Sequence, residues 1–175
     1  MEHSKNQIKK ITFSALLIAV GLVLPQLFHL IGGTAAGTTM LPMHIPVLIA
    51  GLLLGPSMGM SVGLLLPLVS SLLMGMPPAI RLPFMMVELF TYGLVIGLLM
   101  KKTDNALLSL VGAQIIGRIA YGLSLVVGIY LLQIPAPALA GFLPGILSGI
   151  PGLVIQWLLI PILVHLLKGR IRIDG

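Results

Sequence analysis

The sequence predicts an all-α integral membrane protein, a single transmembrane domain over residues 1–175 with six membrane-spanning helices. Hydrophobic residues make up 58% of the chain and charged residues only 8%, whereas a soluble domain carries about 25% charged residues. Only helices or closed barrels satisfy backbone polar groups in lipid. Because a spanning helix uses about 20 apolar residues plus a connection, a chain of 175 residues allows at most six spans.

The first span is predicted at residues 11–31, after a polar and basic N-terminal segment. No small-residue cleavage site ahead of a soluble domain follows, so we expect this helix to stay in the protein. The small polar residues from Gly32 to Thr39 are typical of a loop and end the span.

The apolar stretch at 41–76 is too long for one helix, and Gly55-Pro56-Ser57 divides it. This division predicts the second span at 43–54 and the third at 57–74. The second span is shorter than a bilayer is thick. We therefore expect it to be tilted, to begin inside the preceding loop or to be shielded by protein.

Prolines set the remaining helix boundaries. A proline-rich connection leads to the fourth span at 83–100, and the fifth span is predicted at 106–132. The last apolar stretch is also divided by prolines, which predicts a short leading helix and then a kinked sixth span at 149–167.

The distribution of basic residues supports this topology. With a cytoplasmic N-terminus, six spans place eight of the ten Lys and Arg residues on the cytoplasmic side. These are Lys5, Lys9, Lys10, Lys101, Lys102, Lys168, Arg170 and Arg172. Such a bias predicts that both termini are cytoplasmic. Because the basic residues stand at helix ends rather than along an exposed stripe, the net charge of +6 does not indicate nucleic-acid binding.

Two ionisable side chains, Glu88 and Arg118, lie inside the apolar chain. A charge at bilayer depth costs roughly 2.5–3.5 kcal/mol, so a membrane protein usually keeps one for a partner or a ligand. Glu88 and Tyr92 are four residues apart and share a helix face. Gln114, Arg118 and Tyr121 follow the i, i+4, i+7 rule on the next span. We expect these residues to line a substrate cavity.

Two interpretations of the charged pair stay open. Either a ligand binds at Glu88 and Arg118, or the two form a buried ion pair that only holds helices together. At about 1.5 Å per residue, Glu88 and Arg118 lie at depths in the membrane that differ by several ångströms. The length of the Arg118 side chain or a tilt of the helices can bridge this difference. We favour the ligand site, because apolar packing would stabilise the helices as well as such a pair does.

Three further polar residues are candidates for substrate contact. His44 opens the second span near the outer face, and Gln156 falls in the outer part of the last span. Arg81 lies in the proline-rich outer loop, where it can attract anionic solutes. Each also has a simpler interpretation as an interfacial or solvated residue.

Sequence motifs give no support for an enzyme. No HExxH or GxSxG motif occurs, and the chain has no cysteine, which excludes thiolate metal sites and cysteine nucleophiles. We therefore expect no catalytic residue, no metal site and no cofactor in this chain. The absence of a Walker A motif indicates that the chain does not hydrolyse ATP itself.

Four segments resemble a known family: Leu41–Gly51, Pro67–Pro78, Glu88–Gly93 and Ala15-Leu16-Leu17-Ile18-Ala19. With six short spans, they resemble the substrate-binding S component of an energy-coupling factor (ECF) vitamin transporter over nearly the whole chain. The last segment matches the family's AxxxA pattern. Alone that pattern is weak, because small residues pack any two membrane helices.

The resemblance implies a multi-pass protein of the bacterial cytoplasmic membrane that binds a vitamin near the outer face. It also implies that Ala15 and Ala19 dock on a transmembrane coupling protein, while two cytoplasmic ATPases use ATP to drive uptake. Riboflavin, pantothenate and cobalamin are among the vitamins of this family. Arg118 and Arg81 slightly favour a carboxylate-bearing substrate such as pantothenate, and Glu88 favours a hydroxyl- or nitrogen-rich portion.

Two other functions remain open from the residues alone. One is a stand-alone secondary transporter with Glu88 as proton carrier, although the chain has no convincing inverted repeat. The other is a non-transporting scaffold that assembles through Ala15 and Ala19, which would hold no tightly bound small molecule.

Overall fold

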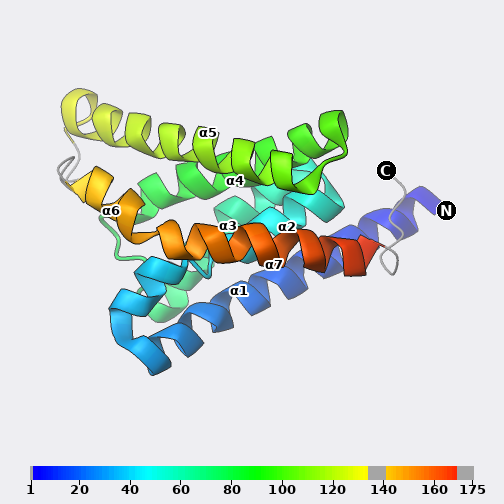
Figure 1. Cartoon of the computed structure of the whole chain (residues 1–175), viewed down its shortest axis with the longest axis horizontal. Helices are drawn as coiled ribbons and strands as arrows, with labels where there is room; N and C mark the ends of the chain where they lie inside the picture. The colour runs from blue at the N-terminus through cyan, green and yellow to red at the C-terminus, as the bar shows by residue number, and fades with distance from the viewer. Residues whose placement is uncertain (1, 134–140, 169–175) are drawn as a thin grey trace.

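The computed structural model describes residues 2–133 and 141–168, and these residues are almost entirely helical (Figure 1). The elements in chain order are α1 (Glu2–Met40), α2 (His44–Leu54), α3 (Pro56–Met74), α4 (Leu82–Thr103), α5 (Ala106–Val126), the π-helical segment η1 (Val127–Leu131), α6 (Phe142–Ser148) and α7 (Ile150–Lys168).

The long helices run side by side between two ends of the molecule (Figure 1). The start of α1, the α4–α5 connection and the end of α7 share one end. Arg81 precedes α4 at the opposite end. This segregation of the basic residues agrees with the predicted topology, whereas Arg170 and Arg172 lie outside the described residues. That both termini are cytoplasmic stays a prediction.

Among the described residues, five helices are long and apolar enough to cross a membrane: Ser4–Gly33 within α1, then α3, α4, α5 with η1, and α7. Helix α2 has 11 residues, and at about 1.5 Å per residue it is shorter than a bilayer is thick. Nine of its residues are buried. Protein therefore shields this short helix, which is one of the three arrangements we expected, and the count of six spans stays a prediction.

The segment after Gly33 differs from the loop expected from the sequence. Gly32 and Gly33 leave the helical conformation, with φ −136° and ψ 17° at Gly32 and φ 65° and ψ −164° at Gly33. A positive φ of this kind is readily accessible to glycine. The chain kinks there and turns back as a further helical segment to Met40 (Figure 1).

Glycines bring the backbones of α2, α3 and α4 into direct contact. A Cβ added at Gly59 or Gly93 would overlap the carbonyl group of the other glycine, and one at Gly63 would overlap the Leu89 carbonyl. Membrane helices approach closely where small residues face each other. The inner faces of these three helices thus form a tightly packed core that fixes the position of α4.

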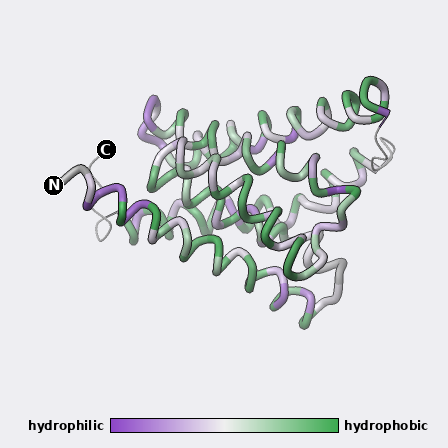
Figure 2. Tube along the Cα trace, turned by 180° about the vertical axis from the view of Figure 1, so that it is seen from behind, coloured by the Kyte–Doolittle hydropathy of each residue, from purple (hydrophilic) through white to green (hydrophobic). Residues whose placement is uncertain are grey.

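Hydrophobic residues recur along every helix, and hydrophilic stretches include the start of α1 and the α4–α5 connection (Figure 2). Large apolar side chains such as Leu123 on α5 and Leu158 on α7 are exposed. This outward apolar surface is what a lipid-facing bundle requires.

Candidate functional site

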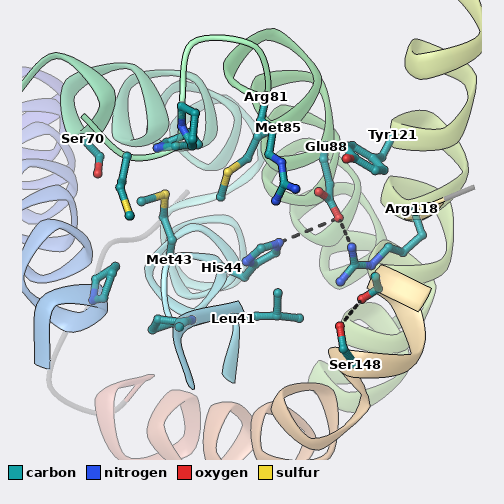
Figure 3. A pocket seen from close by; sticks show the side chains of 18 of the residues that line it. Leu41, Met43, His44, Ser70, Arg81, Met85, Glu88, Arg118, Tyr121 and Ser148 are labelled. Atoms are coloured by element: carbon teal, nitrogen blue, oxygen red, sulfur yellow. Dashed lines mark hydrogen bonds and ion pairs between the residues drawn. The ribbon is translucent and has the colours of Figure 1, made fainter. Parts of the chain in front are cut away.

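A cavity of about 580 Å³ lies at the end of the bundle opposite the start of α1. The kinked end of α1, the start of α2, the end of α3, the start of α4, α5 and α6 all contribute residues to its lining. Its walls combine charged side chains with methionine, proline and aromatic groups (Figure 3). A hollow of this size with a few convergent polar groups is the usual form of a small-molecule site.

Glu88 is the acidic group of the cavity and comes from the rigidly packed α4. Its side chain is buried, its Oε1 accepts a hydrogen bond from Tyr92 Oη at 3.0 Å, and the same oxygen forms an ion pair with Arg118 Nη1 at 2.9 Å. The Tyr92 bond follows from the i, i+4 spacing. Tyr92 lies directly against Gly117, and this contact brings α5 close enough for Arg118 to reach the carboxylate.

Arg118 uses only part of its hydrogen-bonding capacity in the ion pair. Its Nε and Nη2 atoms are buried and have no hydrogen-bond partner among the described residues. These two nitrogens form one edge of the planar guanidinium, and such an edge binds a carboxylate with two parallel hydrogen bonds. Buried Glu88 and half-buried Arg118 thus form an ion pair that leaves donors of Arg118 unused.

His44 lies much deeper than an interfacial residue would. It is 4% exposed, and its ring packs against Tyr92 with centroids 5.3 Å apart. Its Nε2 is 3.8 Å from Glu88 Oε1, and neither ring nitrogen has a hydrogen-bond partner in the described part of the chain. His44 lines the cavity (Figure 3), so both nitrogens are suited to a bound molecule.

Arg81 and Tyr121 also line the cavity. Arg81 is exposed, has no acidic partner among the described residues and directs its side chain into the cavity (Figure 3). The Tyr121 ring stacks on Phe142 of α6, with centroids 5.9 Å apart and 22° between the planes. With Glu88 already paired by Arg118, the cavity keeps one net positive charge.

Tyr92, Gln114 and Gln156 do not line this cavity. Tyr92 supports Glu88 from behind, and the two glutamines bond to each other, with Gln114 Nε2 donating to Gln156 Oε1 at 2.9 Å. Each of these three residues thus has a hydrogen-bond partner within the protein. That they contact the substrate directly stays a prediction.

Among the lining residues that sequence reasoning did not single out, three contribute a hydroxyl group or an aromatic ring. Ser70 and Ser148 contribute hydroxyl groups, and Phe142 contributes its ring. Ser70 lies in the Pro67–Pro78 segment and is a polar residue in an apolar span, which is a weak signal. No pattern in the sequence singles out Ser148 or Phe142.

The Ala15 and Ala19 side chains are exposed on the surface of α1, whereas Ser14 and Leu17 turn into the bundle. The AxxxA face is therefore free of internal packing and accessible to a neighbouring protein in the membrane. That it docks on a coupling protein stays a prediction.

Comparison with known families identifies the class of protein. Residues 9–164 match the model of the family described as ECF transporter, substrate-specific component. The chain therefore belongs to this family, as its motifs indicated. A search of curated proteins and a search of solved structures gave no match.

Membership in this family defines the general role of the chain. Its members are multi-pass subunits of the cell membrane that bind a substrate and act within an ECF transporter together with a coupling protein and ATPases. They are transporter subunits rather than enzymes. The five long apolar helices agree with this role.

Proposed function

We propose that this protein is the subunit of an ECF importer that binds a small water-soluble vitamin or related micronutrient in the cavity between α1, α2, α4, α5 and α6. The observation that carries the proposal is the buried Glu88–Arg118 pair, which lines the cavity and leaves two guanidinium donors unpaired. A pair used only for helix packing would need neither the cavity nor unsatisfied donors, since a buried donor without a partner costs about 1–3 kcal/mol.

The charges of the cavity favour an anionic substrate. Arg81 has no acidic partner in the described part of the chain, and the free edge of Arg118 has the geometry that carboxylates bind. Glu88 and His44 offer an acceptor and two ring nitrogens to hydroxyl or amide groups. A vitamin that combines a carboxylate with such groups, of which pantothenate is an example, suits this arrangement best.

Uptake in this proposal depends on other subunits. The exposed Ala15 and Ala19 face of α1 docks on the transmembrane coupling protein, and two cytoplasmic ATPases supply energy by hydrolysing ATP. This chain carries no cofactor of its own. The kinked end of α1 and the connection before α4 both line the cavity, and we expect them to gate it from the outer side.

Mass spectrometry of small molecules that co-purify with the detergent-solubilised protein tests the binding role directly. We expect one tightly bound, carboxylate-bearing compound. Uptake of its labelled form into vesicles should require the coupling protein, both ATPases and ATP. Uptake by this chain alone under a pH gradient would instead support a proton-coupled transporter, and absence of any bound compound would support a scaffold.

Docking through α1 has its own test. Ala15→Trp or Ala19→Trp should abolish assembly with the coupling protein while substrate affinity is nearly unchanged, because both side chains face away from the cavity. Ile8→Trp, at another exposed position on α1, is the matched control. Equal loss of folding and binding in the Ala15 and Ala19 variants would contradict docking.

A further inference from the structure

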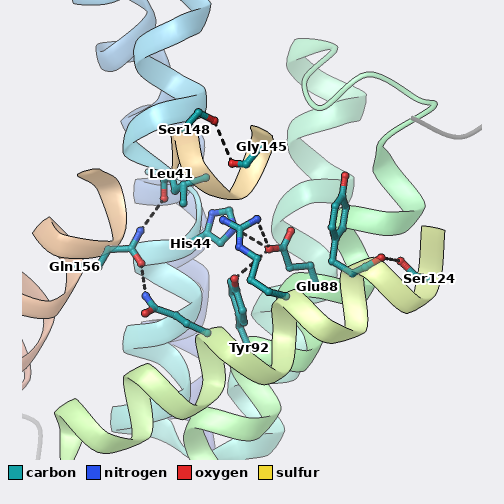
Figure 4. Close-up of polar contacts among 11 residues, drawn as sticks. Leu41, His44, Glu88, Tyr92, Ser124, Gly145, Ser148 and Gln156 are labelled. Atoms are coloured by element: carbon teal, nitrogen blue, oxygen red, sulfur yellow. Dashed lines mark hydrogen bonds and ion pairs between the residues drawn. The ribbon is translucent and has the colours of Figure 1, made fainter. Parts of the chain in front are cut away.

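A chain of hydrogen bonds outside the cavity connects α5 and α7 to its wall. Trp157 Nε1 donates to Gln114 Oε1 at 2.6 Å, and Gln114 Nε2 donates to Gln156 Oε1 at 2.9 Å. Gln156 Nε2 in turn donates to the Leu41 carbonyl oxygen at 3.3 Å (Figure 4). Each amide accepts one bond and donates the next, so the chain has a single direction that ends at Leu41.

Leu41 is the corner between α1 and α2 and a part of the cavity wall. Its φ is +49°, a left-handed conformation that costs roughly 1 kcal/mol or more in a residue with a side chain. Its carbonyl also accepts from the His44 backbone N–H at 3.1 Å. The Leu41 side chain and the Arg118 guanidinium both lie against Gly149. The conformation of this corner therefore affects both the wall and the start of α2, where His44 stands.

The glutamines are costly residues for this location. Gln114 is 4% and Gln156 1% exposed within a largely apolar bundle. Polar residues inside the membrane are expensive, and those that are kept are usually functional. Methionine would fill the same space without an amide to satisfy. The two glutamines bond to each other and to Trp157. Among the described residues they make one further hydrogen bond, which is to the Leu41 carbonyl oxygen.

We propose that Gln156, held in place by Gln114, is a positioning residue that fixes the Leu41 corner and so sets the wall of the substrate site beside Arg118. The inference rests on the proposed function, because it takes the cavity to be the substrate site. It assigns Gln156 to the shape of the site rather than to direct contact with the substrate.

Thiol labelling tests the inference without any substrate. Because the chain has no cysteine, Leu41→Cys provides a unique thiol in the cavity wall. A water-soluble, negatively charged methanethiosulfonate reagent reports its accessibility in the purified protein. We expect Gln156→Met to change the labelling rate about two- to tenfold, the range that loss of one neutral hydrogen bond produces. Gln114→Met should give a smaller change, and Trp157→Phe the smallest.

Ser148→Cys is the matched control, because Ser148 lines the same cavity from α6 and its hydroxyl group bonds to the Gly145 carbonyl oxygen rather than to a glutamine. Its labelling rate should not respond to Gln156→Met. Equal changes at both thiols would show general loosening of the bundle and would overturn the inference. No change at the Leu41→Cys thiol would overturn it as well.

An affinity measurement adds a second readout. With pantothenate as the probe, Gln156→Met should weaken binding two- to tenfold. Unchanged affinity in Gln156→Met would contradict the inference. If the unmodified protein does not bind pantothenate, the substrate proposed above fails, and the labelling rates alone decide the role of Gln156.

Discussion

The two walls of the cavity are built differently. Glu88 stands on α4, whose backbone touches α3 at Gly59, Gly63 and Gly93. Arg118 faces α6, a helix of seven residues, none of which is buried. One wall is fixed by backbone contacts, whereas the other is held by side chains such as the stacked Tyr121 and Phe142. Such a division lets a site keep its carboxylate in place while its opposite wall adapts to a substrate.

The fixed wall is the place where one substitution should have the largest effect. Gly93→Val places a branched Cβ against the Gly59 carbonyl, which is backbone and cannot turn aside. We expect a loss of at least about 3 kcal/mol, at the upper end of overpacking costs, and a corresponding fall in melting temperature.

Gly145→Val on α6 is the matched control. Gly145 is also a helical glycine of the cavity lining, but a Cβ there meets nothing within 4 Å. Its melting temperature should be unchanged or slightly higher, since valine forms helix better than glycine. Similar losses in both variants would contradict the distinction between the two walls.

Arg81 should affect binding without affecting stability. Arg81→Met removes the unpaired cation of the cavity, so affinity for an anionic substrate should fall by about 1.5–3 kcal/mol, or roughly ten- to two-hundredfold. The melting temperature of the empty protein should not change, because the side chain is exposed and has no ion-pair partner among the described residues. Isothermal titration measures the affinity, and equal affinity in both proteins would exclude Arg81 from the site.

The adaptable wall should show the smallest effect. Phe142→Ala removes the stacking on Tyr121, a contact worth about 0.5–1.5 kcal/mol. We expect substrate dissociation to become a few fold faster. Leu143→Ala, which changes an exposed neighbour outside the cavity lining, should leave the dissociation rate unchanged. An unchanged rate in Phe142→Ala would show that α6 does not retain the substrate.

Most of the helical architecture could be predicted because it depends on local sequence. The Gly55-Pro56 break falls between α2 and α3, whereas α1 extends from Glu2 to Met40, beyond both ends of the first predicted span at 11–31. The helical segment after Gly33 could not be predicted, because it depends on a distant contact. Its end lies against α7, where a Cβ at Gly152 would crowd the backbone of Thr39 and Met40.

The site was predictable where charge made it conspicuous. Glu88 and Arg118 stand out in an apolar chain, and the spacing of Glu88 and Tyr92 predicted their common face. That Gln114 and Gln156 bond to each other outside the cavity was not predictable. A glutamine that binds a substrate and a glutamine that bonds to another glutamine both point into the bundle, so the sequence pattern is the same. The depth of His44 depends on the turn at Leu41, which no sequence pattern indicates.

The most direct test measures melting temperature without ligand and dissociation constant side by side for Arg118→Met, Glu88→Gln and the double variant. Arg118→Met leaves Glu88 buried and unpaired, so the empty protein should lose about 3–5 kcal/mol of stability. Glu88→Gln should restore much of that stability in the double variant. The double variant should nevertheless bind substrate roughly ten- to two-hundredfold more weakly than the unmodified protein, because the guanidinium donors are gone. A double variant that is stable and binds with unaltered affinity would contradict the central claim, since the pair would then serve only to hold the helices together.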